Sequence, residues 1–238
     1  MILHAFGSSD VGKVRPGNED AFVVRSDIGL FAVADGMGGH IAGEVASRTA
    51  LDALSAALTI APADDTAMLQ AVRLANLAVW ERGESEHDKA GMGTTLTALA
   101  FVPGEPKCII GHVGDTRVYL LRAEQLEQLT RDHTAAQEMV ERGQLTRQAA
   151  RRHPLASMLY RSIGTRPEVD VDIVHTALES GDLLLICSDG LSGMVEDEDL
   201  LAILDQDKPL QTLSEELIDA ANLRGGVDNI TAVLIKTE

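Results

Sequence analysis

The sequence predicts an α+β fold in which helices pack outside antiparallel sheets. Short apolar runs typical of strands come in groups, and helical stretches come in pairs between these groups. A doubly wound sheet would instead alternate strand and helix strictly along the chain. No internal repeat, low-complexity tract or linker rich in proline and serine interrupts the sequence. We therefore expect a single domain over residues 1–238, with one sizeable hydrophobic core.

The first elements are two strands, expected over Ala21–Val24 and Leu30–Ala34. A helix is expected from about Gly43, because apolar residues then recur at three- and four-residue spacing. Pro62 is expected to end this helix. A second amphipathic helix is expected over about Asp65–Glu84, since one of its faces is apolar. The residues of that face are Met68, Val72, Ala75 and Val79.

A strand-rich block follows, divided by turn-prone pieces such as Pro103–Pro106. Its expected strands are Thr94–Val102, Cys108–Val113, Arg117–Leu121 and Gln125–Leu129. The next stretch, from Asp132 to about Pro167, is polar and predicts a helix and loops without a strong apolar face. The remaining expected elements are the strands Asp170–Val174 and Leu183–Ser188, a helix near Pro209–Asn222 and a final strand Ile230–Ile235.

The chain carries 20 basic and 37 acidic residues, a formal net charge of −17. Such a surface repels nucleic acid and anionic membranes, so we expect neither as a partner. The charge has two explanations: solubility alone, or bound cations that neutralise part of it. Cys108 and Cys187 lie in apolar runs without metal or disulfide spacing, which suits a reducing cytoplasm. No apolar run approaches the roughly 18 residues that span a bilayer.

Aspartates stand at the ends of several apolar strands, next to glycine or another small residue. They are Asp20, Asp35, Asp115, Asp189 and Asp228. A lone Asp-Gly pair is typical of a hairpin turn, but the sequence after Asp35 and Asp189 is helical or irregular. Carboxylates gathered at one edge of the core repel one another, and cations are the simplest remedy. All-oxygen ligands select hard ions such as Mg²⁺ or Mn²⁺.

The residues around these aspartates suggest how a phosphate and an ion are held. Gly36, Gly38 and Gly39 let the backbone approach an ion closely and adopt positive φ. A nucleotide-binding loop is rejected, because no Lys-Ser/Thr pair follows. Arg15 lies shortly before Asp20, and its guanidinium offers a planar, bidentate grip on phosphate. In isolation Arg15 would be read as a solvated surface residue.

Ordered motifs along nearly the whole chain resemble the metal-dependent protein phosphatases of type 2C, and most of all their compact bacterial branch. The match runs over about residues 8–236. The motifs are Gly12…Arg15…Asn18-Glu19-Asp20, Ala34-Asp35-Gly36-Met37-Gly38-Gly39-His40, Gly91-Met92-Gly93-Thr94-Thr95, Val113-Gly114-Asp115-Thr116-Arg117, Cys187-Ser188-Asp189-Gly190-Leu191 and Asp228-Asn229-Ile230-Thr231.

The resemblance implies a central β-sandwich of two antiparallel sheets, with a helical pair on each outer face and a metal cluster at one end. Asp35 would bridge two Mn²⁺ or Mg²⁺ ions, and the Gly36 carbonyl would bind one of them. Asp189 and Asp228 would complete the shell of the first ion. Asp115, together with Asp189, would hold a third and weaker ion.

The resemblance also implies the reaction. Arg15 would bind the substrate phosphate, Asp20 would hydrogen-bond water on the ions, and a water activated by metal would attack phosphorus directly. The substrates would be proteins phosphorylated on serine or threonine by a cognate kinase, and the enzyme would act as a monomer. The polar stretch 132–167 would form a flap beside the site.

Some positions depart from the family's pattern or stay in reserve. Met37 occupies the place where many animal relatives carry a histidine considered to be a general acid, which leaves His40 or a water as candidates. Thr116 replaces the usual serine and keeps its hydroxyl. Asp132 is a weaker candidate ligand for the third ion. The other histidines weighed, which we interpret as structural, are His112, His133 and His153.

Two alternatives stay open at the level of sequence. One is a binding module that keeps the fold but has lost catalysis, although none of the core aspartates is missing. The other is a different metal-dependent phosphohydrolase, such as a nuclease or a phosphatase of a small phosphorylated metabolite. The acidic charge argues against the nuclease.

Overall fold

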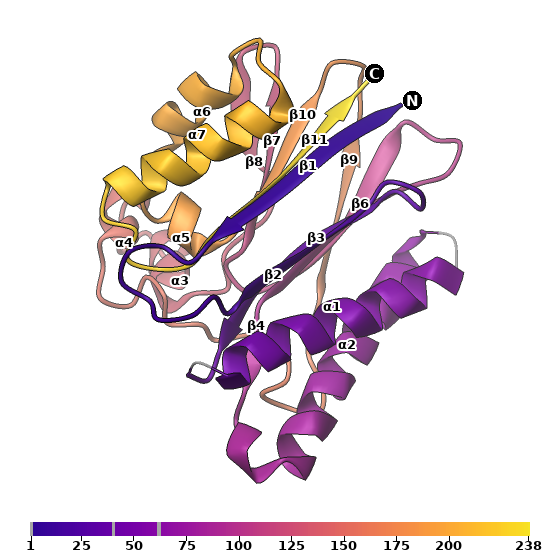
Figure 1. Cartoon of the computed structure of the whole chain (residues 1–238), viewed down its shortest axis with the longest axis vertical. Helices are drawn as coiled ribbons and strands as arrows, with labels where there is room; N and C mark the ends of the chain where they lie inside the picture. The colour runs from indigo at the N-terminus through magenta and orange to yellow at the C-terminus, as the bar shows by residue number, and fades with distance from the viewer. Residues whose placement is uncertain (1, 40, 61–62) are drawn as a thin grey trace.

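The computed structural model describes residues 2–39, 41–60 and 63–238. Two antiparallel sheets form its centre (Figure 1). The first has the order β1-β11-β10-β7-β8, with bounds Leu3–Asp10, Ile230–Thr237, Leu183–Cys187, Arg117–Arg122 and Gln125–Gln128. The second has the order β2-β3-β5-β6-β9, with bounds Asp20–Arg25, Leu30–Met37, Leu96–Phe101, Lys107–Val113 and Asp172–Ala177. The short strand β4 (Gly93–Thr94) pairs with β3.

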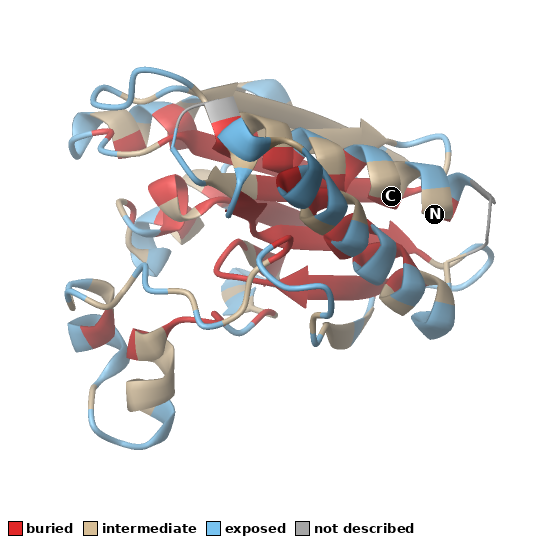
Figure 2. Cartoon of the chain, turned by 90° about the horizontal axis from the view of Figure 1, so that it is seen from below, coloured by how far each residue is buried: buried red, intermediate tan, exposed pale blue. Residues whose placement is uncertain are grey.

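Helices cover both outer faces of this sandwich. Helices α1 (Ile41–Ile60) and α2 (Asp65–Ser85) lie on the β2–β9 sheet, and α6 (Asp197–Leu204) and α7 (Leu210–Leu223) lie on the other sheet (Figure 1). Figure 2 shows the consequence: the strands are largely buried, and the helices turn exposed faces to solvent. The predicted α-β-β-α arrangement of layers is confirmed.

Residues of β3 show why these strands are apolar throughout. Side chains alternate between the two faces of a strand. Phe31 and Val33 point into the cluster between the two sheets, and Leu30, Ala32 and Ala34 point into the cluster under α1 and α2. Because each face meets a covered layer, alternation with polar residues is lost.

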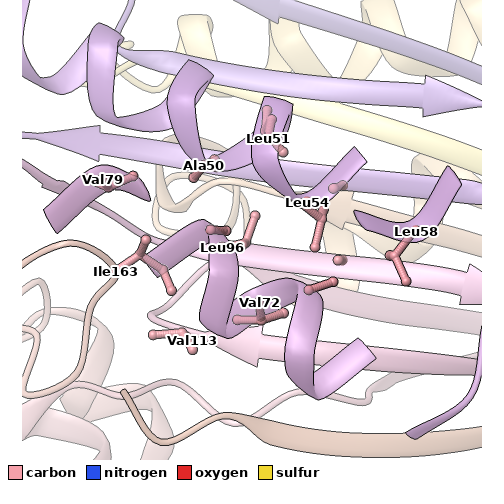
Figure 3. Close-up of a cluster of buried hydrophobic side chains, with 14 of the residues drawn as sticks. Ala50, Leu51, Leu54, Leu58, Val72, Val79, Leu96, Val113 and Ile163 are labelled. Atoms are coloured by element: carbon pink, nitrogen blue, oxygen red, sulfur yellow. The ribbon is translucent and has the colours of Figure 1, made fainter. Parts of the chain in front are cut away.

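The helix-side core joins α1 and α2 to the sheet beneath them. Leu51, Leu54 and Leu58 of α1 pack with Val72 and Val79 of α2 over the strand residues Leu96 and Val113 (Figure 3). The predicted apolar face of α2 is buried, from Met68 to Val79. Asp64 begins α2 by accepting a hydrogen bond from the Ala67 amide over 2.7 Å. Pro62, which was expected to end the first helix, lies outside the described residues.

Several elements differ from the sequence prediction. Strand β1 was not expected; it pairs with β11 along its whole length. Helix α6 and the single turn α5 (Asp189–Ser192) were not expected either. The strand predicted over Thr94–Val102 is divided at Thr95, whose amide bonds to the carbonyl of Asp35 instead. Strand β9 lies at Asp172–Ala177, later than the predicted Asp170–Val174.

The stretch 132–167 contains two short helices where one helix was expected. They are α3 (Ala135–Glu141) and α4 (Arg147–Arg151). The buried Asn76 of α2 anchors the end of the stretch: its amide nitrogen donates to the carbonyls of Arg166 and Pro167, and its oxygen accepts from the Gly164 amide. At the end of α4, Arg151 donates hydrogen bonds to the carbonyls of Ser192 and Val195.

The two ends of the described chain lie side by side. The Ile2 amide bonds to the Glu238 carbonyl over 2.7 Å, and the Glu238 amide bonds to the Ile2 carbonyl over 2.9 Å. These two hydrogen bonds extend the β1–β11 pairing beyond its end, where Leu3 faces Thr237 (Figure 1). None of the described helices has the length and unbroken apolar character needed to cross a membrane.

Leu54→Ala tests the helix-side core. Leu54 is fully buried, so truncation leaves a cavity and should lower the free energy of unfolding by about 2–5 kcal/mol. Urea denaturation followed by circular dichroism measures this change. Leu74→Ala is the matched control, because Leu74 is 52% exposed on α2 and should change stability by no more than about 0.5 kcal/mol. Equal losses in the two variants would contradict this packing.

Candidate metal centre

The predicted aspartates come together at one end of the sandwich. Asp20 and Asp35 face each other across the β2–β3 pair. Asp189 lies two residues after β10, at the start of α5, and Asp228 lies two residues before β11, which pairs with β10 in the other sheet. The two sheets are tied at this point, because the hydroxyls of Ser188 and Thr231 both donate to Asp20 Oδ2 over 2.7 Å. Aspartates from distant parts of the chain therefore share one site.

Asp20 is buried and carries an unsatisfied oxygen. Its Oδ2 accepts the two hydroxyl bonds, but Oδ1 has no hydrogen-bond partner among the described residues. Burial raises the pKa of Asp20 to about 7; the hydroxyls of Thr231 and Ser188 oppose this shift, and repulsion from Asp189 and Asp228 adds to it. A buried, unpaired carboxylate oxygen is costly, so the site favours a bound cation or water there.

The main chain fixes Asp35. Its amide donates to Thr95 Oγ1 over 2.9 Å, and its carbonyl accepts from Thr94 Oγ1 over 2.9 Å. Burial raises the pKa of Asp35 well above its usual value, and repulsion from the other aspartates of the site raises it further. The proximity of Asp35 partly offsets the rise in the pKa of Asp189 that burial and Asp228 cause.

Asp189 and Asp115 show the same electrostatic strain. Burial raises the pKa of each carboxyl, with repulsion from Asp228 acting on Asp189 and repulsion from Asp189 acting on Asp115. Asp189 Oδ1 is a second buried oxygen without a partner among the described residues. Asp35 and Asp189 are partly exposed, whereas Asp115 is buried. The group therefore has an accessible side and an enclosed side.

Gly36 is required by close packing of the backbone. A Cβ there would lie 2.2 Å from the Gly43 carbonyl oxygen and 2.6 Å from that of Glu19. Its φ is not positive, unlike those of Gly38 and Gly39, for which the predicted conformational role holds. The glycine after Asp35 lets three backbone segments meet beside the carboxylates.

Asp132, the reserve ligand, is already bound by protein groups. Arg117 Nη2 lies 2.7 Å from Asp132 Oδ2, and Arg117 Nε lies 3.0 Å from Oδ1. Gln128 donates a further bond to Oδ1 over 3.1 Å. This ion pair lies in a cleft of about 850 Å³ between α3, α4 and the β7–β8 edge. Its guanidinium satisfies the carboxylate, so Asp132 has less need of an ion than Asp115.

Arg15 pairs with a predicted metal ligand. Its Nη2 lies 2.6 Å from Asp228 Oδ2, and the side chain is about half exposed, at 48%. The hydrogen bond to Asp228 raises the pKa of Arg15. The guanidinium thus stands at the edge of the carboxylate group, on its accessible side, where a phosphate would meet both.

The histidines near the site are engaged elsewhere. His112 Nε2 donates to the Arg131 carbonyl, and burial lowers the pKa of His112 to about 4. His133 Nδ1 accepts from the Gly114 amide over 3.0 Å, which supports the backbone next to Asp115. His153 Nδ1 accepts from the Leu155 amide. These contacts fit structural roles. His40, one of the two candidate proton donors, lies outside the described residues.

The carboxylate group suits hard divalent cations. Its donors are all oxygens, two of them are buried without partners, and mutual repulsion makes the metal-free state unfavourable. No three His, Cys, Asp or Glu side chains in the described part of the chain form a closed ligand set by themselves. The predicted ligand set adds the Gly36 carbonyl to the aspartates, and Mg²⁺ usually keeps several waters as well.

Comparison with known families identifies the chain at this point. The family model described as protein phosphatase 2C matches residues 14–225, which include every predicted site residue except the final aspartate. The chain belongs to the protein phosphatase 2C family. The predicted resemblance is therefore confirmed.

Relatives of this phosphatase family match the chain over nearly its whole length. The serine/threonine phosphatase stp of Listeria monocytogenes is 36% identical, over 99% of this chain and 96% of the relative. The phosphatase PhpP of Streptococcus pneumoniae is 37% identical, over 95% and 94%. The crystal structure of the Mycobacterium tuberculosis phosphatase PstP/Ppp has a TM-score of 0.93 at 39% identity and covers 100% of both chains.

One solved relative carries metal. The catalytic domain of the serine/threonine phosphatase PstP, solved in complex with two manganese ions, has a TM-score of 0.89 at 38% identity and covers 99% of each chain. Its ions belong to that protein. The carboxylate group described above is the place in this chain with the chemistry to bind such ions.

Sequence reasoning missed the residues that hold the site together. Asn229 is buried; its Oδ1 accepts from the Glu19 amide, and its Nδ2 donates to the carbonyls of Val11 and Gly17. It thereby ties the loop that carries Arg15 to the start of β11. Ser188 and Thr231 do the same for Asp20. The signal in the sequence is that all three residues belong to the motifs around Asp189 and Asp228, although the motifs alone assign them no role.

The metal-free protein should lose stability as the pH rises. Because the pKa of Asp20 rises from 3.8 to about 7 on folding, its contribution is fully present below 3.8 and is lost as the pH rises through about 7. Thermal unfolding in a chelator should therefore show a midpoint that falls between about pH 4 and about pH 7, and Mn²⁺ should reverse the fall.

Asp20→Asn should make this pH dependence shallower in the chelator, because one of the carboxyls with a raised pKa is removed. Asp52→Asn, an exposed site on α1, is the control and should keep the wild-type slope. A midpoint that rises with pH in the metal-free protein would contradict the described electrostatics.

Proposed function

We propose that this chain is a metal-dependent protein phosphatase that hydrolyses phosphoserine and phosphothreonine in proteins. The observation that carries the proposal is the group of mutually repelling carboxylates at the end of a 2C-type sandwich. The whole-length similarity to named serine/threonine phosphatases supports the same activity. Phosphorylated proteins are therefore the substrates, and we further propose that a cognate serine/threonine kinase produces them.

The donors define our proposed ligand set. Asp35 would bridge two Mn²⁺ or Mg²⁺ ions, and the Gly36 carbonyl would bind one of them. Asp189 and Asp228 would complete the set of ligands around the first ion. Asp115, with Asp189, would hold a weaker third ion. When bound, such ions neutralise phosphoryl charge and lower the pKa of water. Asp20 Oδ1, which has no partner among the described residues, would accept a hydrogen bond from a water on the ions and orient it.

Arg15 would grip the phosphate. Asp228 now pairs with Arg15, but in our proposal Asp228 binds a metal ion. When cation and phosphate bind, Asp228 would pair with the cation and Arg15 with the phosphate. A guanidinium presents parallel donors that match phosphate oxygens. It would hold the phosphorus in line for attack, which lowers the entropic cost of reaching the transition state.

The cysteines do not suit nucleophilic catalysis. Burial raises the pKa of Cys108 and of Cys187 to about 12, so neither thiol is ionised near neutral pH. This supports direct attack by water without a covalent intermediate. Both thiols are free, which also supports our proposal of a reducing cytoplasm. We propose a monomeric enzyme with one catalytic domain and a flap over about residues 132–167.

Asp35→Asn should abolish turnover. It removes the charge proposed to bridge two ions, so kcat on a phosphothreonine peptide with Mn²⁺ should fall by more than about a hundredfold. The midpoint shift caused by Mn²⁺ should shrink as well, which reports binding without catalysis. Asp52→Asn is the control. Near-normal activity of Asp35→Asn would overturn the assignment, and peptide binding without any hydrolysis by the wild type would indicate a binding module.

Arg15→Ala should mainly weaken productive binding of phosphate. We expect kcat/KM to fall by about a hundredfold, because the phosphate loses both its charge partner and its position. Arg15→Lys should recover only part of the loss, since an ammonium cannot form two parallel bonds. Arg48→Ala removes another exposed arginine, on α1, and should leave kinetics unchanged. The assignment fails if steady-state assays give the same kcat/KM for Arg15→Ala and Arg48→Ala.

A further inference from the structure

Exposed aliphatic side chains gather beside the proposed catalytic centre. Among the described residues, nine large hydrophobic side chains are exposed. Four of them lie on the loop after β1, on the last residue of α7 or on the loop that follows α7. We call these four the aliphatic surface: Val11, Val14, Leu223 and Val227. Val14 is 65% exposed and Leu223 is 82% exposed, so neither contributes to the core. Such clustering of exposed apolar residues marks an interaction site more often than scattered ones do.

The two loops form one surface because their backbones are bonded together. The Lys13 amide donates to the Gly226 carbonyl over 2.7 Å. Gly12 has φ +77°, and a Cβ there would lie 2.3 Å from the Asp228 carbonyl oxygen. Asn229 ties Val11 to the same place. In Figure 1 the loop after β1 and the chain between α7 and β11 run side by side at this end of the sandwich.

This surface is continuous with the phosphate site. Val14 precedes Arg15 and Val227 precedes Asp228, and these two charged side chains bond each other over 2.6 Å. A protein segment whose phosphate reaches Arg15 therefore comes close to Val14 and Val227. The surface is fixed relative to Arg15, because the same hydrogen bonds hold both.

We infer that the aliphatic surface binds a leucine-like side chain flanking the phosphorylated residue of the substrate, an inference that rests on the proposed function. Binding energy from such a remote contact helps to position the reacting phosphate. A second copy of this chain is a poorer occupant, because two chains of charge −17 repel each other. Four aliphatic side chains also offer less than the roughly 800 Å² per partner that stable complexes bury.

The test compares two phosphothreonine peptides of equal charge, one with leucines and one with serines on both sides of the phosphothreonine. Wild-type enzyme with Mn²⁺ should hydrolyse the leucine peptide with a kcat/KM about tenfold higher, as expected for one aliphatic contact. Equal kcat/KM values would overturn this inference alone. Hydrolysis of neither peptide would overturn the proposed function and this inference with it.

Variants localise the preference. The double variant Val14→Ser/Leu223→Ser changes two exposed side chains, so it should fold normally and should lower the leucine-to-serine ratio of kcat/KM from about ten to about one. Leu74→Ser is the matched control on α2 and should keep the wild-type ratio. A ratio unchanged in the double variant would overturn the inference. So would light scattering that shows a wild-type dimer dissociated by the double variant, since the surface would then join two copies.

Discussion

Mutual repulsion of buried carboxylates is the constraint on which the rest of this structure depends. Carboxyl groups from both sheets converge at one end of the sandwich, where burial and neighbouring charge raise the pKa of Asp20, Asp35, Asp115 and Asp189. The guanidinium of Arg15, bonded to Asp228, relieves this cost only in part. The fold thus holds its carboxylates close together in a place where bound cations would neutralise their repulsion.

Precise placement of these acids comes from small polar groups and from close backbone contacts. Two hydroxyls join Asp20 of one sheet to the strand ends of the other. Asn229 bonds three backbone groups of the loop that carries Arg15. Gly190 serves the same purpose, because a Cβ there would lie 2.0 Å from the Asn229 carbonyl oxygen. The rigidity of the site therefore resides in groups that take no part in the chemistry.

Periodicity and strand-end aspartates were sufficient to predict antiparallel sheets with helices outside them, the two long helices and the convergence of acids. The number of layers was predicted only from the family resemblance. Strand β1 was not predicted because its sequence, Leu3–Asp10, has few apolar residues. Its backbone pairing with β11 stabilises it instead. Side-chain pairs between residues far apart in the sequence were not predicted, for a different reason. Arg15 and Asp228 are 213 residues apart, and only the folded chain shows that they meet. The ion pair of Asp132 with Arg117 was not predicted either, since it depends on the turn between β8 and α3.

The pairing of β1 with β11 has a consequence for attachments to the molecule. Leu3 and Thr237 meet at one end of this pair, while Asp10 and Ile230 meet at the other, next to the aspartates. Eight residues of strand separate these ends, a span of about 26 Å. A tether or fused partner joined at either terminus therefore emerges far from the reaction, and the adjacent termini make circular permutation feasible without opening the sandwich.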